Sequence, residues 1–473
     1  MKKKKNNLRN RETNIISFVF VGLFMIMIIY VCIFNIKDAT QLINNPYNKR
    51  IDNQSFKVVR GDILSADGKI LATTETDEEG NEIRVYPFGD IYCHSVGFCS
   101  NVKMGVESSE NYYLLSESDN IFDQISTDLS GEKAKGHNVY TTLDSKLQEA
   151  AYYAMGDNKG AVIAMEPSTG KILCMVSNPA FDPNDVDEEY KEWLNYESAD
   201  SVLLNRATQG LYPPGSTFKI LTALEYVREN KSSYRDFEYV CDGSDYEEGG
   251  TIIPCADGKE HGHQNLVEAF ANSCNSAFSH IGANLNKRSF SNLCYTFMFN
   301  KYIPVEFEYS MSSFVLDENS GVSECQETAM GQGKTMISPL HNLMIVSTVA
   351  NKGTMMTPYI VDRVEDYNGR CVEQKTPSSI DVLMNEEEVG YITECMEAVV
   401  DSGTGTAFRW TSYDVAGKTG SAQYDESGNV HSWFVGFADT ENPSIAISVV
   451  LEGGYSGSSA QYVAKKVFDA YFS

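Results

Sequence analysis

A serine and a lysine three positions apart are the strongest candidates for covalent chemistry in this chain. Residues 212–219 read YPPGSTFK, and apolar residues follow them at helical spacing. The prolines and the glycine end whatever precedes them, so Ser216 is predicted at a helix start, with Lys219 one turn further along the same face. Helix N-termini favour negative charge, and a desolvated lysine can take the proton of a hydroxyl. The pattern predicts a serine nucleophile with a lysine base.

The S-x-x-K spacing alone is weak evidence, because serine and lysine are common residues. It recurs in polar or turn-forming segments, at Ser100 with Lys103, Ser130 with Lys133, and Ser168 with Lys171. None of these three serines opens an amphipathic helix, whereas Ser216 does.

Two further motifs follow the serine helix in order along the chain. The first is Ser273-Cys274-Asn275 and the second is Lys418-Thr419-Gly420. S-x-N also occurs at residues 118–120 and 427–429, but both copies fall outside the interval between the other two motifs. Taken singly, each residue has an ordinary structural explanation, such as a helix cap or a solvated strand residue. The ordered combination makes a shared catalytic site much the stronger interpretation.

The N-terminus predicts a membrane anchor. Six lysines and arginines lie within residues 1–14, and an apolar run of about 22 residues spans 15–36, close to the ~20 residues that cross a bilayer. The run is too long for a signal-peptide core, and no small-residue cleavage site follows it. The positive-inside rule then leaves the basic tail in the cytoplasm and places the rest of the chain outside it, as a single-pass protein of the cell membrane. The formal net charge of −27 argues against nucleic acid as a partner.

The cysteines do not form an obvious disulfide framework, although an exported location permits disulfides. Cys241 and Cys255, on either side of an acidic, glycine-rich stretch, are the best candidate pair, and Cys93 with Cys99 is a weaker one. Cys255 with His261 and His263 resembles a zinc cluster only loosely. We expect neither a metal nor a cofactor.

The hydrophobic pattern predicts a mixed α/β fold in which one antiparallel sheet is assembled from both ends of the catalytic domain. Residues 37–138 are polar and turn-rich and are predicted to form an N-terminal pedestal. In the catalytic domain, residues 139–473, apolar strands are predicted at residues 160–165 and 172–176 and again at 415–418, 433–437 and 445–451, and a helix closes the chain. Residues 200–400 are predicted to be a mainly helical lobe. The site is expected in the cleft between this lobe and the sheet, with Lys418 on an edge strand.

These motifs resemble those of the class B penicillin-binding proteins, which are peptidoglycan transpeptidases. The resemblance extends from about Phe56 to the end of the chain. It includes residues 60–63 (RGDI), 331–333 (GQG), 403–405 (GTG) and 433–436 (WFVG). The short pedestal is most similar to the compact members of the penicillin-binding protein A type. The resemblance implies a penicillin-binding/β-lactamase-like transpeptidase domain.

The resemblance also implies a role for each candidate residue. Ser216 would be the acylated nucleophile and Lys219 its general base. Ser273 would relay a proton to the leaving amine with help from Lys418, and Asn275 would hold the backbone of the donor peptide. The substrate would be the D-Ala-D-Ala end of a peptidoglycan stem peptide, or a β-lactam that mimics it.

The resemblance places the substrate-binding residues in and directly after the third motif. Lys418 and Thr419 would bind the terminal carboxylate of the substrate. Gly420 follows them, and the backbone N–H groups of Ser216 and Ser421 would form the oxyanion hole.

Other functions for the same site remain open at this stage. The serine could serve a D,D-carboxypeptidase or a β-lactamase, although an anchor and a pedestal are unnecessary for a β-lactamase. A scaffold or a β-lactam sensor is a non-enzymatic alternative, and a sensor would need a cytoplasmic domain larger than the ~14-residue tail. The region before residue 139 is too short for a glycosyltransferase domain, so we expect a separate membrane glycan polymerase of the SEDS type as a partner.

Overall fold

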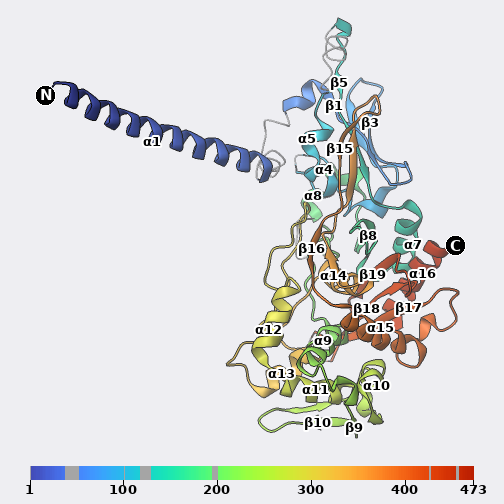
Figure 1. Ribbon diagram of the computed structural model, residues 1–473. Helices are drawn as coiled ribbons and strands as arrows, with labels where there is room; N and C mark the ends of the chain where they lie inside the picture. The colour runs from blue at the N-terminus through green and yellow to red at the C-terminus, as the bar shows by residue number, and fades with distance from the viewer. Residues whose placement is uncertain are drawn as a thin grey trace.

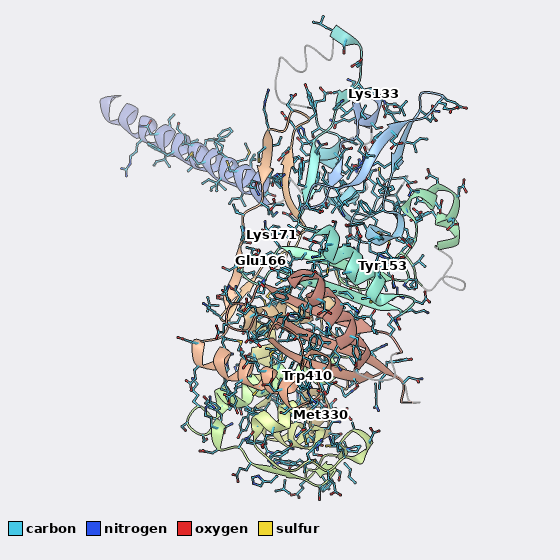
Figure 2. All side chains as sticks on the ribbon, turned by 90° about the vertical axis from the view of Figure 1, so that its right-hand side faces the viewer. Lys133, Tyr153, Glu166, Lys171, Met330 and Trp410 are labelled. Atoms are coloured by element: carbon cyan, nitrogen blue, oxygen red, sulfur yellow. The ribbon has the colours of Figure 1, made fainter. Side chains whose placement is uncertain are left out.

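The computed structural model describes residues 2–37, 53–100, 102–117, 129–193, 201–424, 428–453 and 458–473. Apart from the first helix, these residues form an elongated body (Figure 1). A pedestal lies at one end, a five-stranded sheet in the middle and a helical lobe at the other end. Lys133 is at the pedestal end and Met330 is in the lobe (Figure 2). The fold therefore places the pedestal far from the lobe.

The central sheet is antiparallel and has the strand order β17-β18-β19-β7-β8. Its strands are β17 (Val415–Gln423), β18 (Val430–Ala438), β19 (Ile445–Leu451), β7 (Gly160–Met165) and β8 (Ile172–Asn178). The two ends of the catalytic domain meet where β19 pairs with β7. This confirms the predicted assembly from both ends of the domain, including the position of Lys418 on an edge strand.

Both faces of this sheet are buried, which explains why its strands read as continuous apolar runs. Val162 and Ala164 of β7 pack beneath α7 (Ser145–Met155) and α16 (Ser458–Phe472), whereas Ala161 and Ile163 join the core on the opposite face. That opposite face is covered by α14 (Pro339–Ala350), all of whose residues are buried. The sheet is thus the rigid layer to which the site is attached.

The helical lobe contains more strand than the sequence predicts. Its helices are α9 (Lys219–Glu229), α10 (Leu266–Ala271), α11 (Asn275–Asn284), α12 (Lys287–Thr296), α13 (Val322–Ala329) and α15 (Glu386–Asp401). Between α9 and α10 lie two small hairpin-like pairs, formed by β9 (Tyr239–Cys241), β10 (Ser244–Tyr246), β11 (Ile252–Pro254) and β12 (Gly262–Gln264). This small β region lies at the far end of the lobe (Figure 1).

The pedestal is built around a six-stranded sheet with the order β15-β14-β6-β2-β3-β4. Its strands are β2 (Ile63–Leu64), β3 (Ile70–Thr76), β4 (Glu82–Val85), β6 (Asn138–Thr141), β14 (Val361–Glu365) and β15 (Cys371–Gln374). A turn at Asp67-Gly68 joins β2 to β3. Strands β14 and β15 come from far later in the chain, a long-range pairing that local sequence patterns do not reveal. Where the central sheet meets the pedestal, Lys171 Nζ lies 3.0 Å from Asp362 Oδ1 of β14 (Figure 2 labels Lys171). This ion pair ties the central sheet to the pedestal.

The polar core of the pedestal is a buried carboxylate between two arginines. Glu107 accepts a hydrogen bond from Arg60 and another from Arg84, each 2.6 Å long. Arg60 also donates to Asn111 and to the backbone oxygen of Glu107. Burial opposes ionisation of Glu107, but the two guanidinium groups outweigh it and lower the pKa of the carboxyl group. Arg60 of the RGDI motif therefore has a structural partner.

One helix among the described residues is long and apolar enough to cross a membrane. It is α1 (Lys2–Lys37), and its candidate span is Thr13–Phe34. The span buries no surface against the rest of the chain, and α1 projects from the body in Figure 1.

Candidate active site

Ser216 lies in a tight helical turn that two other segments hold in place. The turn, η4 (Gly215–Phe218), leads directly into α9. Trp433 of β18 donates its indole N–H to the Pro213 oxygen at 3.1 Å, and the Gly215 N–H donates to the Gly331 oxygen at 2.8 Å. Ser216 is half-buried among buried neighbours and lines a cleft. The predicted serine at a helix start is thus observed, with a single 3₁₀ turn before the α-helix.

The GQG segment explains how this turn can approach its support so closely. Gly331 has a φ of +79°, and a Cβ atom there would lie 1.9 Å from the Gly215 oxygen. Only glycine fits, because any side chain would collide with the backbone next to the candidate nucleophile. Gly420 of the third motif is less constrained, since a Cβ there would lie 3.0 Å from Cβ of Trp433, a contact that a small shift could relieve.

Lys219 is fully buried and points to the second motif. Its ammonium nitrogen donates to the Ser273 backbone oxygen at 2.8 Å and to Asn275 Oδ1 at 2.9 Å. It also lies 3.3 Å from Ser273 Oγ. Two carbonyl-type acceptors match the two N–H donors of a neutral amine, which leaves the lone pair of Nζ available. Burial lowers the pKa of Lys219 to about 8.

Lys418 meets the same hydroxyl from the sheet side. Its Nζ donates to Ser273 Oγ at 2.9 Å and to the Thr419 oxygen at 3.0 Å, and its side chain is fully buried. The carboxylate-binding role that the resemblance implies for Lys418 calls for a charged side chain. Instead, burial first and the Lys219 charge second lower the pKa of Lys418 well below its usual range. In the free protein its surroundings therefore oppose the charge, since its hydrogen-bond partners among the described residues are a hydroxyl and a backbone carbonyl oxygen.

Ser273 connects the two lysines through an unusual backbone conformation. It is a non-glycine residue with a φ of +54°, in the left-handed region. Such conformations cost about 1–3 kcal/mol and persist only where the surroundings enforce them. Here α11 begins two residues later, and Asn275, its first residue, donates from Nδ2 to the Pro254 oxygen at 3.2 Å. The turn presents the Ser273 hydroxyl between the two lysine nitrogens.

The three motifs share one cleft of about 380 Å³. It is lined by Ser216, Ser273 and Asn275 and, on the β17 side, by Thr419, Gly420 and Ser421. A Cβ on Gly215 would lie 2.9 Å from the Ser421 oxygen, so the backbone of β17 runs directly beside the serine turn. Met330, labelled in Figure 2, also lines the cleft. The structure brings together all eight residues that the sequence singled out, with Lys219 and Lys418 buried behind the cleft.

Two polar residues of the cleft had no role assigned from sequence. Thr404 lies in the GTG segment, and its hydroxyl is 2.6 Å from that of Thr419. Gln332 lies between the two glycines of GQG and also lines the cleft. Both glycine-flanked triplets carry the family resemblance, so a polar residue held between two glycines was the signal that could have identified them.

The competing serines take part in ordinary local structure. The Ser100 hydroxyl donates to Asp187 at 2.6 Å, and Lys171 pairs with Asp362 rather than with Ser168. The Ser130 hydroxyl accepts from the N–H of Glu132. The two other S-x-N triplets include residues that lie outside the described ranges. None of these described contacts forms a serine–lysine pair.

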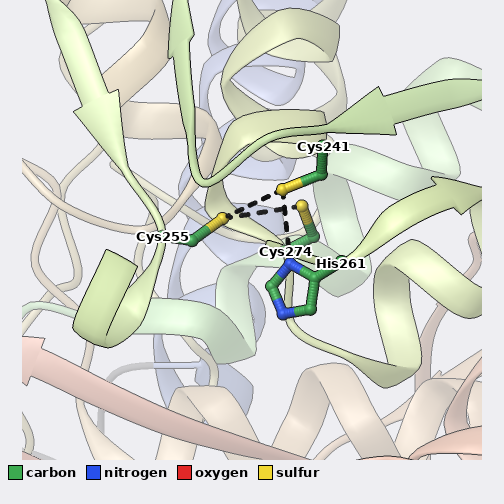
Figure 3. Close-up of side chains that lie close together, drawn as sticks. All are labelled: Cys241, Cys255, His261 and Cys274. Carbon is green, nitrogen blue, oxygen red and sulfur yellow. Dashed lines mark hydrogen bonds between the residues drawn. The ribbon is translucent and has the colours of Figure 1, made fainter. Parts of the chain in front are cut away.

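The predicted disulfides are absent from the described residues. Cys241 and Cys255 are free thiols with their sulfurs 3.6 Å apart, and Cys93 and Cys99 are also free. Cys241 and Cys255 belong instead to a cluster with His261 and Cys274 (Figure 3). The other histidine considered from sequence, His263, lies 3.4 Å from Glu238 and outside this cluster.

Comparison with protein families matches two consecutive regions of the chain. Residues 160–472 match the penicillin-binding protein transpeptidase domain, and residues 60–139 match the penicillin-binding protein A dimerisation domain. The chain is 30% identical over 437 residues to the peptidoglycan D,D-transpeptidase PbpA of Mycolicibacterium smegmatis, with 87% of each protein covered. It is also 30% identical to stage V sporulation protein D of Bacillus subtilis, covering 86% of this chain and 64% of that protein.

Solved structures agree with these matches. The D,D-transpeptidase domain of a peptidoglycan glycosyltransferase from Eggerthella lenta superposes with a TM-score of 0.80 at 29% identity, over 88% of this chain and 98% of that one. The imipenem acyl-enzyme complex of penicillin-binding protein A from M. tuberculosis superposes with a TM-score of 0.81 at 26% identity, over 89% of this chain and all of that one.

Proposed function

Because the chain belongs to the class B penicillin-binding proteins, which are D,D-transpeptidases of peptidoglycan synthesis, we propose that it cross-links stem peptides through an acyl-enzyme on Ser216. One observation carries the proposal: the Ser273 hydroxyl lies within 3.3 Å of Lys219 Nζ and 2.9 Å of Lys418 Nζ, behind a cleft that Ser216 also lines. The proposed nucleophile, base, proton relay and carboxylate-binding lysine thus share one site.

The acylation step uses the first two motifs. Neutral Lys219 takes the proton as Ser216 Oγ attacks the carbonyl carbon of the penultimate D-Ala. The backbone N–H groups of Ser216 and Ser421 receive the developing oxyanion, and the adjacency of Gly215 to the Ser421 backbone supports this pairing. The tetrahedral intermediate then expels the terminal D-Ala. Ser273 passes a proton to the departing nitrogen, so that D-Ala leaves as an amine with its carboxylate intact and the acyl group remains as an ester on Ser216.

The third motif binds the carboxylate of the leaving D-Ala. Lys418 and Thr419 are its partners in the proposal, and the Thr404 hydroxyl beside Thr419 fixes the orientation of that side chain. A buried carboxylate favours the charged form of a neighbouring lysine, so substrate binding raises the pKa that burial lowers in the free protein. The cation thus forms when its anionic partner arrives. Gly420 keeps the strand close to the serine turn, and Asn275 holds the donor backbone.

In the second half-reaction, an amine from a neighbouring stem peptide attacks the Ser216 ester and restores the serine. A penicillin would follow only the first half, because opening of the β-lactam ring leaves no departing group.

We also propose an arrangement of the chain in the membrane. Residues 15–36 of α1 anchor the protein, and residues 1–14 stay in the cytoplasm. The pedestal (37–138) and the transpeptidase domain (139–473) lie outside. A separate SEDS-type polymerase would supply the glycan strands.

Mass spectrometry with a penicillin tests the site. Incubation of the full-length protein should add the mass of one intact penicillin, and peptide mapping should locate it on Ser216. An adduct on another serine would refute the assignment. Supplying donor and acceptor peptides then separates the activities: a cross-linked product identifies a transpeptidase, whereas release of D-Ala alone would identify the carboxypeptidase alternative.

A further inference from the structure

Three cysteine sulfurs and one imidazole nitrogen converge beside the active site (Figure 3). They belong to Cys241, Cys255, Cys274 and His261, and all four donor atoms lie within 4.8 Å of one another. Cys241 ends β9, Cys255 follows β11, His261 precedes β12 and Cys274 precedes α11. Residues separated by up to 33 positions therefore bring four metal-ligating atoms to one point.

The separations between these atoms match a tetrahedral metal site. A zinc ion with Zn–S bonds of ~2.3 Å and a Zn–N bond of ~2.0 Å separates two sulfurs by ~3.8 Å and a sulfur from the nitrogen by ~3.5 Å. In the structure, Cys241 Sγ is 3.6 Å from Cys255 Sγ and 3.4 Å from His261 Nδ1. Cys255 Sγ is 3.7 Å from Cys274 Sγ. A disulfide would require a separation of ~2.05 Å.

The surrounding backbone supports the cluster on several sides. Pairing of β9 with β12 places Cys241 opposite Gly262, next to His261. The N–H of Cys255 donates to the Gly243 oxygen at 2.9 Å, and the N–H of Ala277 lies 3.4 Å from the Cys274 sulfur. An N–H group directed at a sulfur stabilises its thiolate form, which is the form that binds metals. These contacts orient the ligands without occupying the point on which they converge.

The three sulfurs are also sealed from solvent. Cys241, Cys255 and Cys274 are each 3% exposed or less, and His261 closes the remaining side as a half-buried ring. A closed set of three thiolates and one imidazole is typical of structural zinc, because soft ligands select zinc and no position stays open for water. The small hairpins around it contribute few apolar residues, so a metal would supply the cross-link that a larger core supplies elsewhere.

We propose that Cys241, Cys255, His261 and Cys274 bind one Zn²⁺ as a structural site that positions the second catalytic motif. Cys274 lies between Ser273 and Asn275, both of which contact Lys219. Fixing the Cys274 sulfur to three ligands from the β9–β12 region holds the left-handed Ser273 turn in place. The four ligands act through that turn, so they are positioning residues.

The metal content of the full-length protein, purified in detergent without chelator, tests the proposal. We expect about one zinc per chain, and replacement by Co²⁺ should give the d–d bands of tetrahedral cobalt with intense sulfur-to-cobalt charge transfer. Weakening an outer-shell partner alone lowers metal affinity by about 10–100-fold, so His261→Ala should lower it at least that much. His263→Ala is the matched control, because it removes an exposed imidazole two residues away that pairs with Glu238.

A second pair of variants tests the thiols. Cys255→Ala should lose the metal, whereas Cys294→Ala removes a buried thiol outside the cluster and should keep it. Ser216→Ala should also keep the metal, which separates this proposal from the acyl-enzyme. Absence of sulfur-to-cobalt bands, or equal metal loss in His261→Ala and His263→Ala, would overturn the site. So would a Cys241–Cys255 disulfide in protein purified without reductant.

Discussion

Replacing Lys219 with arginine removes the ability to accept a proton while keeping a positive charge. Lys219 is fully buried, and burial lowers its pKa to about 8. Arginine stays protonated in proteins, so it cannot serve as a base at any working pH. Loss of a general base costs about 10²–10⁴-fold, and we therefore expect Lys219→Arg to lose acylation nearly as completely as Lys219→Ala.

The lowered pKa of Lys219 also predicts how much the acylation rate of the unmodified protein changes with pH. With a pKa of about 8, the neutral fraction of Lys219 rises from roughly 9% at pH 7 to roughly 91% at pH 9. Acylation by a fluorescent penicillin, measured as the second-order rate constant in stopped flow, should rise about tenfold over that interval.

The corresponding variants at Lys418 should behave differently from those at Lys219. Arginine can still pair with a carboxylate, so Lys418→Arg should retain more acylation activity than Lys418→Ala.

The lowered pKa of Lys219 also predicts that the free energy of unfolding increases with pH. A lysine whose folded pKa lies below its unfolded value of 10.5 destabilises the fold at low pH, and this penalty disappears as pH rises from about 8 to 10.5. The shift corresponds to ~3 kcal/mol. The free energy of unfolding of wild type should therefore gain that amount relative to Lys219→Met across the interval. A flat rate profile, or Lys219→Arg with wild-type acylation, would refute the assignment of Lys219 as the base.

Three further substitutions test other parts of the structure. Ser216→Ala should abolish penicillin labelling and change the melting temperature little, because it removes one hydroxyl from a cleft-facing, half-buried residue. Gly331→Ala should reduce both acylation and stability, whereas Gly333→Ala, with a similar φ of +74° but its nearest atom 3.4 Å away on a side chain, should cost only the ~1–2 kcal/mol of a left-handed alanine in thermal unfolding. Glu107→Gln should destabilise the pedestal by ~3 kcal/mol or more, since it leaves two guanidinium groups without their carboxylate. The exposed Glu82→Gln control, which loses an ion pair with Lys133, should cost less than ~1 kcal/mol in the same calorimetric comparison.

Much of the fold and the grouping of the candidate site residues was predictable from local sequence. The helix start at Ser216 follows from the preceding prolines and glycine, and the central strands follow from apolar runs buried on both faces. One sheet built from both ends of the catalytic domain could be predicted because apolar strands cluster there, and the structure joins them where β19 pairs with β7. For the helix start and the strands themselves, the physical signal lies within a few neighbouring residues.

Features that depend on distant partners were not predictable in the same way. The hairpin of β14 and β15 joins the pedestal sheet across more than 200 residues, and its outer strand β15 is exposed along its whole length, so no local apolar pattern marks it. The convergence of Cys274 on Cys241 and Cys255 likewise depends on the path of four separate segments. Sequence spacing pointed to Cys255, His261 and His263, and in a regular strand two residues at i and i+2 would share one face. Gly262 between the two histidines has a φ of +69°, which interrupts that alternation, and only His261 reaches the sulfurs.

The two buried lysines determine where the proton of the Ser273 hydroxyl can point. A hydroxyl accepts up to two hydrogen bonds and donates one, and Ser273 Oγ lies within hydrogen-bond distance of both Lys219 Nζ and Lys418 Nζ. If both nitrogens donate, the Ser273 proton must point away from them, which suits delivery to a leaving amine. If Lys219 turns its lone pair to Ser273, that proton returns to the base. We infer that the direction of the Ser273 proton follows the charge on the lysines. A substrate carboxylate that favours charged Lys418 would therefore prepare the relay at the moment when it is needed.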